Sequence, residues 1–198
     1  MPNPALPAAP ELLLASGSRY RAELLARLRL PFAAVASQAD ETPQPGESPR
    51  TLVMRLSAAK AQALRPAHPR AWILGSDQVA VIAGHIVGKP GSRERAIAQL
   101  RAASGRAVDF LTGVVLQTPQ RAYEALNVTT VRFRALADAE IERYVDAEAA
   151  FDCAGSFKCE GYGISLFEAI DSRDPTALIG LPLIAVCRLL REAGYPLP

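Results

Sequence analysis

Four charged side chains of this chain stand where a hydrophobic core would not need them. Asp77 follows the apolar stretch "WILGS", and Glu41 lies in the loop sequence "DETP". Lys60 falls in the last turns of a predicted helix, and Lys89 stands between a glycine and a proline in "GKP". Carboxylates supply the oxygen ligands that Mg²⁺ prefers, and lysines bind phosphate oxygens. Taken singly, each residue also has a plain structural interpretation, as a loop cap or a solvated surface charge.

The stretch "LLLASGSRYRAELLARL", residues 12–28, joins a predicted strand to a predicted helix through Ser16 and Ser18. Arg19 and Arg21 fall in the first turn of that helix, where the helix dipole disfavours positive charge. Free amides at a helix N-terminus and arginine side chains both bind phosphate, so an anion would compensate these charges. The stretch lacks the spacing of a Walker A loop. Phosphate binding and an ordinary strand–loop–helix junction both stay open at this point.

The composition argues against several classes of protein. Apolar residues make up 49% of the 198 residues, which is enough for a packed core and argues against disorder. The formal net charge of +2 predicts no nucleic-acid or membrane surface, and no apolar run approaches the roughly 18 residues of a membrane-spanning helix. Three cysteines without a CxxC pair favour a reducing cytoplasm over a disulfide framework or a zinc site. The proline-rich residues 1–10 are expected to be a flexible extension, not a targeting signal.

Strands and helices interleave along the chain, which predicts an α/β fold. Two alternating segments, 108–117 and 123–133, predict an antiparallel hairpin and therefore a mixed sheet. Residues 71–82 read as two apolar runs broken by polar residues, which places Asp77 just past the end of a buried strand, where α/β folds build their sites. The other predicted elements are strands over 12–15 and 32–36, helices over 18–28, 92–103, 136–145 and 181–193, a helix that opens at Ser48 or Thr51, and a glycine-rich loop over 153–170 that leads into a strand.

Several segments together resemble the Maf family of nucleotide pyrophosphatases along nearly the whole chain. The matching segments are "LLLASGSRYRAELL", "DETP", "AAKAQAL", "ILGSDQVAV", "GKP", "LRAASGRAVDFLTGVVL", "VRFRAL", "CAGSFKCEGYG" and "IGLPL". The resemblance implies a single Maf-like domain over residues 11–198. It also implies a mixed twisted sheet flanked by helices, with two lobes around a central cleft, as in ITPase-like proteins. A homodimer is expected by family analogy alone.

Two motifs resemble one branch of that family. "GSDQ" and "GSFKCEG" are similar to the branch that hydrolyses 7-methyl-GTP, whereas the branch acting on dTTP and UTP typically shows "ADT" and "GAYGIQG". The resemblance implies hydrolysis of this small-molecule nucleotide to 7-methyl-GMP and pyrophosphate, with Mg²⁺ or Mn²⁺ as the divalent metal cofactor. Two alternatives remain. One is a pyrophosphatase for another non-standard nucleotide, such as a modified pyrimidine triphosphate. The other is a non-catalytic nucleotide-binding regulator of cell division, against which the pair Glu41 and Asp77 argues.

Residue by residue, the resemblance implies three kinds of role. Asp77 matches the catalytic aspartate and would hold the metal together with Glu41. The positions expected to bind substrate phosphate are Ser16, Arg21, Lys60 and Lys89. The positions associated with the choice of base are Tyr20, Gln78 and Glu160.

The predicted base-binding residues suit a 7-methylguanine base. Methylation at N7 makes guanine cationic, and an aromatic ring or a carboxylate attracts a cation. Tyr20 and Glu160 are therefore of the right chemical types, although Tyr20 could instead only pack on the first helix. Arg19 stands where the family usually has proline, and its role stays open. Lys158 has two open assignments, phosphate binding or pairing with Glu160.

Overall fold

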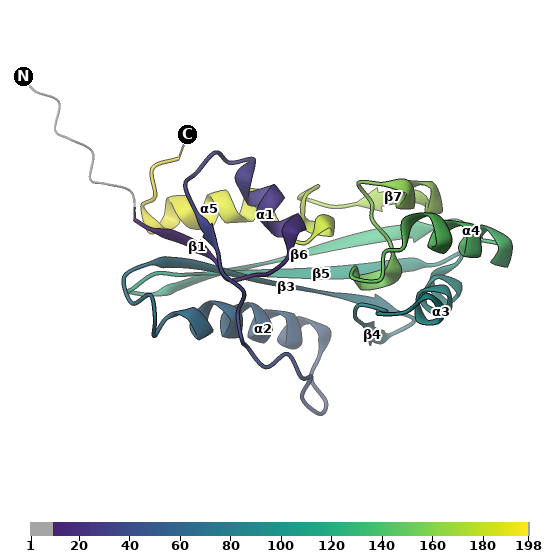
Figure 1. The fold of residues 1–198 in the computed structure, drawn as a ribbon, viewed down its shortest axis with the longest axis horizontal. Coiled ribbons are helices and arrows are strands. Elements are labelled where there is room, and N and C mark those ends of the chain that lie inside the picture. Colours follow the sequence, from purple (N-terminus) through teal and green to yellow (C-terminus); the bar gives the residue numbers. More distant parts are fainter. Residues whose placement is uncertain (1–9, 198) are drawn as a thin grey trace, which may run out of the picture.

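The computed structural model describes residues 10–197. Their strands form one mixed β-sheet. The strand order is β2-β1-β3-β5-β6-β7, with the short β4 paired to β3 (Figure 1). The strands are β1 (Leu12–Leu14), β2 (Ala33–Ala34), β3 (Trp72–Ile82), β4 (His85–Val87), β5 (Ala107–Gln117), β6 (Ala122–Phe133) and β7 (Phe167–Asp171). The predicted hairpin is confirmed, because β5 and β6 pair antiparallel along their length.

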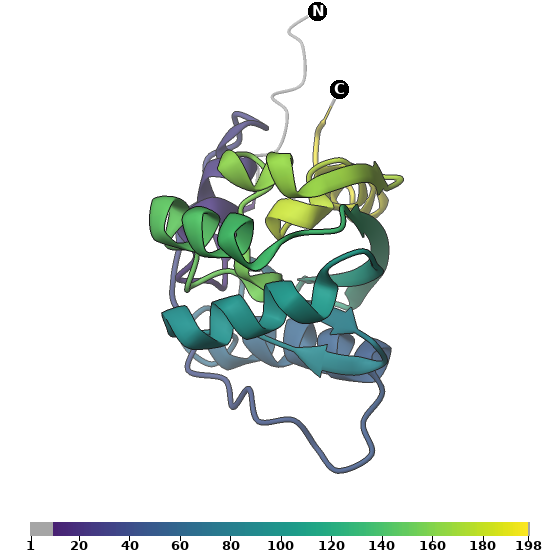
Figure 2. The same cartoon turned by 90° about the vertical axis from the view of Figure 1, so that its right-hand side faces the viewer.

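The helices cover both faces of this sheet. In Figure 1, α2 lies on one face and α1 and α5 lie on the other. Figure 2 shows α3 and α4 side by side across the far end of the sheet. The helices are α1 (Arg19–Ala26), α2 (Pro49–Leu64), α3 (Arg93–Ala103), α4 (Asp138–Glu148) and α5 (Leu183–Ala193), with short 3₁₀ turns η1 (Ala154–Ser156), η2 (Tyr162–Leu166) and η3 (Ala177–Ile179).

Side-chain caps explain where three of the helices begin. Ser18, Ser48 and Ser92 each accept a hydrogen bond from a backbone amide in the first turn, of α1, α2 and α3 respectively. Such a bond satisfies one of the amides that a helix N-terminus leaves without a partner. Ser48, not Thr51, is therefore the residue that opens the second predicted helix.

Two apolar cores lie toward opposite ends of the long strands. The α1–α5 lobe is the core formed by β1, α1, α5 and the nearby parts of β3 and β5. The α3–α4 lobe is the core formed by α3, α4, Phe157 after η1 and the other ends of β3, β5 and β6. Because β3 and β5 run through both lobes, the predicted architecture of a mixed sheet with two lobes is confirmed.

The predicted break in residues 71–82 is wrong, because β3 runs without interruption from Trp72 to Ile82. The polar residues stay in the strand since each pairs with β5, Gly75 with Val115 and Asp77 with Gly113. On the other side of β3, β1 is paired only as far as Leu74 and β4 begins only at Ala80. Residues 75–79 therefore form an open stretch of strand edge, and Asp77 lies in its middle, not past a strand end.

Two predictions concern the extent of the chain's structured part. The predicted flexible extension over residues 1–10 lies, apart from Pro10, outside the described residues. The assignment of residues 11–198 to a single domain stays a prediction. Among the described residues, no helix is both long enough and apolar enough to cross a membrane.

Candidate active site

Alternation along β3 sends neighbouring polar side chains to opposite faces of the sheet. Asp77 faces α2, and its backbone amide donates to Ser57 Oγ at 3.0 Å. Gln78 faces the other way, where its amide nitrogen donates to Thr112 Oγ1 at 2.9 Å. Because the strand edge is open here, a ligand at the edge can reach both side chains.

Two glycines allow α2 to lie unusually close to the sheet. A Cβ atom at Gly75 would collide with the carbonyl oxygen of Ser57, and one at Gly113 would lie 2.8 Å from Ser57 Oγ. This close approach places Lys60, in the fourth turn of α2, directly opposite Asp77. Glycine at position 75 thus allows α2 to place Lys60 in the site, because any side chain there would collide with the helix backbone.

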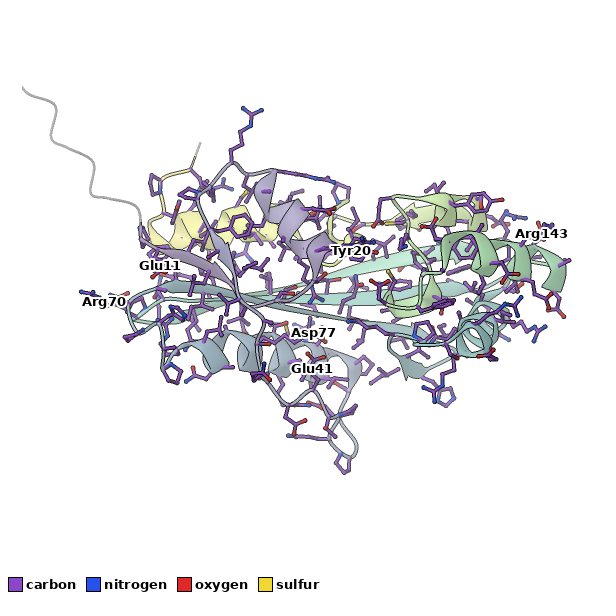
Figure 3. All side chains as sticks on the ribbon, viewed as in Figure 1. Glu11, Tyr20, Glu41, Arg70, Asp77 and Arg143 are labelled. Carbon is purple, nitrogen blue, oxygen red and sulfur yellow. The ribbon has the colours of Figure 1, made fainter. Side chains whose placement is uncertain are left out.

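Lys60 holds two carboxylates together. Its Nζ lies 2.6 Å from Asp77 Oδ1 and 3.0 Å from Glu41 Oε1. Lys60 and Asp77 are almost fully buried, whereas the Glu41 side chain is 59% exposed and reaches in from the loop before α2. Figure 3 shows Asp77 and Glu41 close together on the α2 side of β3. The trio places two carboxylates and one ammonium at a single point, open to solvent on the Glu41 side.

Arg21 approaches the same point from α1. Its Nε donates to the carbonyl oxygen of Gly180 at 2.8 Å, which fixes the guanidinium against the turn before α5. Burial lowers the pKa of Arg21, and the negative charges of Asp77 and Glu41 oppose that shift. Among the described residues, the terminal nitrogens of Arg21 have no hydrogen-bond partner, so they are available to an anion.

Ser16 and Lys89 complete the set that the sequence predicts for phosphate. Ser16 is buried between β1 and α1, and its Oγ accepts from the Ser18 amide at 3.1 Å. Lys89 is exposed and follows Gly88, whose carbonyl oxygen accepts from Gln99 of α3 at 3.2 Å. Gln99 also accepts from Ser156 Oγ at 2.6 Å, so it ties the Lys89 loop to the glycine-rich loop.

All nine predicted site residues line one cavity of about 810 Å³. They come from the β1–α1 junction, the loop before α2, α2 itself, β3, the loop after β4 and the glycine-rich loop. These segments lie far apart in the sequence, so only the fold brings them together. The nine are Ser16, Tyr20, Arg21, Glu41, Lys60, Asp77, Gln78, Lys89 and Glu160.

The three predicted base-binding residues differ in how much freedom they have. The amide nitrogen of Gln78 also donates to the carbonyl oxygens of Ala177 and Leu178, at 2.9 and 3.1 Å, so only its oxygen is left for a ligand. Glu160 is exposed, and the Cys159 thiol donates to it at 3.4 Å. Tyr20 lies on the α1 side of β3 (Figure 3). Gln78 is therefore the most constrained of the three, Tyr20 is half-buried like Gln78, and Glu160 is exposed.

Lys158 pairs with Glu148 and not with Glu160, and its binding of phosphate stays a prediction. Its Nζ lies 3.3 Å from Glu148 Oε1 of α4, and it is not among the residues that line the cavity. Glu148 also accepts from the Tyr162 amide at 2.9 Å, so it anchors the glycine-rich loop on both sides. The pairing partner lies ten residues upstream in another element, and nothing in the local sequence indicates it.

Two further residues of the cavity carry charge and were not predicted to have a role. Arg19 and Asp152 both line it, beside Tyr20 and Cys153. Burial and, to a smaller extent, the neighbouring Asp152 carboxylate raise the pKa of the Cys153 thiol to about 12. The thiol is therefore neutral at physiological pH and is no nucleophile. Asp152 adds a second exposed carboxylate, after Glu160, on the glycine-rich-loop side of the cavity.

The acidic residues suit a divalent cation that takes some of its ligands from the protein and the others from a substrate. The described residues contain no cluster of three or more His, Cys, Asp and Glu side chains that could hold a metal alone. Glu41 and Asp77 nevertheless present two carboxylates at one point, held by the same ammonium. Mg²⁺ is commonly bound by one or two carboxylates and completes its shell with substrate phosphates and water. The chemistry of the site thus suits a metal that arrives with a polyphosphate.

Comparison with a family model and with known relatives identifies the family of this chain. The family model described as "Maf-like protein" matches residues 11–193. A protein of Xanthomonas oryzae pv. oryzae named 7-methyl-GTP pyrophosphatase is 60% identical over 189 residues, which cover 96% of this chain and 100% of that protein. One of Bordetella pertussis with the same name is 53% identical over 191 residues, with 96% and 95% covered. Among solved structures, the Staphylococcus aureus Ham1 protein matches with 15% identity and a TM-score of 0.47, over 65% of this chain and 72% of that one.

Proposed function

The chain belongs to the Maf family, and from that membership we propose that it hydrolyses 7-methyl-GTP to 7-methyl-GMP and pyrophosphate. It is thus a hydrolase of phosphorus-containing anhydrides. One observation supports this most strongly: Lys60 holds Asp77 and Glu41 together in the cavity that Tyr20 and Glu160 also line. The residues proposed for phosphoryl chemistry and those proposed for a cationic base thus line the same cavity.

Cationic side chains would hold the triphosphate. A triphosphate carries about four negative charges near neutral pH, so positive charge must surround it. Arg21 offers its terminal nitrogens from a fixed position, and Lys89 offers an exposed ammonium from the side of the α3–α4 lobe. Ser16 and the amides at the start of α1 add neutral donors. Lys60, which is already paired, would bridge phosphate oxygens and the two carboxylates.

Asp77 is the proposed general base. Its Oδ1 accepts from Lys60, and among the described residues its Oδ2 has no partner, so that oxygen can accept a proton from a water molecule. The water oxygen bonds to the α-phosphorus, the bond from that phosphorus to the bridging oxygen breaks, and pyrophosphate leaves. Glu41 and Asp77 would hold Mg²⁺ or Mn²⁺, which would neutralise phosphate charge and acidify the attacking water.

Tyr20 and Glu160 would select the base. The ring of Tyr20 attracts a cationic purine by stacking and by its negative face. The carboxylate of Glu160 can accept from guanine N1–H and N2–H, and its charge favours a cationic base. A cytoplasmic location and a homodimer complete the proposal, the first supported by three cysteines that are all free.

Exchange of Asp77 for asparagine tests the proposed reaction. Asp77→Asn keeps the size of the side chain but removes the proton acceptor, so kcat for pyrophosphate release from 7-methyl-GTP should fall by at least about 100-fold. The assay compares both proteins on 7-methyl-GTP, GTP, dTTP and UTP, with Mg²⁺ and with Mn²⁺. Metal-dependent release by the variant near the wild-type rate would contradict the assignment. Preference of the wild type for a pyrimidine triphosphate, or no turnover of any nucleotide, would favour one of the two alternative functions.

A further inference from the structure

Arg19 covers the aromatic ring of Tyr20, to which the proposed function assigns the binding of the base. Its guanidinium carbon lies over the Tyr20 ring, 4.8 Å from the centroid, and its Nη2 donates to the Tyr20 hydroxyl at 2.9 Å. The hydrogen bond to Tyr20 raises the pKa of Arg19, and the charge of Asp152 adds to this. A cation is thus already bound where a cationic base would bind.

Tyr20 is the direct contact that holds Arg19 in this position, while Asp152 and Glu23 attract its charge without an ion pair. The side chain is exposed, and among the described residues Tyr20 is its only hydrogen-bond and ring partner. Cation–π contacts at exposed sites are weak, so a ligand that offers a better contact can displace the guanidinium at little cost. The long, unbranched arginine side chain can then turn elsewhere within the cavity that it lines.

The predicted phosphate site lies in the same cavity and offers a destination for a displaced guanidinium. Arg19 lies in the same helical turn as Arg21, and both line the cavity together with Ser16. Without a ligand, two guanidinium groups would repel each other there, because the positive end of the α1 dipole adds to their charge. A bound triphosphate reverses this balance, since its oxygens accept from both arginines.

We propose that Arg19 is an exchange residue, which covers Tyr20 in the free enzyme and moves to the phosphates when a 7-methylguanine triphosphate takes its place. This inference rests on the proposed function. A nucleoside without phosphates must displace Arg19 and forms no new contact with it. The triphosphate also displaces Arg19 but then binds the displaced guanidinium through its phosphate oxygens. Arg19 thereby distinguishes the triphosphate from ligands that share its base.

Binding of two ligands to Arg19→Ala tests this exchange. The variant should bind 7-methylguanosine about two- to fivefold more tightly, because no cation has to leave Tyr20. It should bind the non-hydrolysable α,β-methylene analogue of 7-methyl-GTP about fivefold more weakly or worse, because a charge-assisted phosphate contact is lost. Calorimetry with Mg²⁺ present gives both dissociation constants. Arg27→Ala, at the other end of α1 and outside the cavity lining, serves as control and should change neither.

The proposal requires that Arg19→Ala binds the nucleoside more tightly and the triphosphate analogue more weakly. Weaker binding of both ligands would overturn the proposal, since Arg19 would then only support Tyr20. Tighter binding of both would also overturn it, because Arg19 would then be a simple obstruction, and so would unchanged binding of the nucleoside. Turnover of 7-methyl-GTP by the wild type is measured separately, so a failure of the proposed function is recognised independently and removes the basis of the exchange.

Discussion

Glu160 and Asp152 are the two exposed carboxylates on the glycine-rich-loop side of the cavity, and neither forms an ion pair within the described residues. Both have thiol donors only, from Cys159 and Cys153. A carboxylate without a cationic partner is free to pair with a cationic base. Glu160→Ala should therefore lower the ratio of kcat/KM for 7-methyl-GTP to that for GTP by about two- to tenfold. An unchanged ratio would rule out a role in base choice, and Glu168→Ala on β7 is the matched control.

Individual contacts were the least predictable part of the site. The sequence indicated which residues belong to the cavity, because polar groups beside apolar segments and the family motifs mark them. It did not indicate that Lys158 pairs with Glu148, or that Arg19 covers Tyr20. Such contacts depend on how loops meet in space, and a single sequence carries no pattern for them.

At the scale of elements, the distance between α2 and β3 determines the site. Gly75→Ala would place a methyl group against the backbone of α2, so the helix must move away and carry Lys60 with it. We expect a loss of about 1–3 kcal/mol in the free energy of unfolding, measured with urea, and at least a tenfold loss of kcat. Ala63→Gly, on the exposed side of α2, should cost about 0.5–1 kcal/mol and leave kcat unchanged. If Gly75→Ala keeps full kcat, the close approach does not position Lys60.

Within the described residues, the five helices and the β5–β6 hairpin followed from the sequence, whereas the short β4, the 3₁₀ turns and the continuity of β3 did not. Caps, apolar periodicity and alternation located the helices and the hairpin, because these signals are local. Gly75, Ser76, Asp77 and Gln78 have weak strand propensity, yet they lie within β3. Pairing with β5 and packing against α2 outweigh that local preference, and both are tertiary effects.

At the scale of the whole molecule, the proposed phosphate ligands come from both lobes. Arg21 belongs to α1 in the α1–α5 lobe, whereas Lys89 lies between β4 and α3, beside the α3–α4 lobe. A bound triphosphate would therefore link the two lobes. The free protein does not depend on Lys89, which is exposed and makes no ion pair within the described residues.

Lys89→Ala should separate stability from ligand binding. Its Tm without ligand should equal that of the wild type, because no native contact of the side chain is lost. With the α,β-methylene analogue of 7-methyl-GTP at 100 times its dissociation constant, binding stabilises the wild type by about 2.7 kcal/mol, or roughly 5–10 °C in Tm. A tenfold weaker affinity in the variant would remove about 1.4 kcal/mol of this, so about half of the shift should disappear. Arg95→Ala, exposed on α3 and outside the cavity lining, should retain the full shift. An undiminished shift in Lys89→Ala would show that the α1–α5 lobe holds the triphosphate alone.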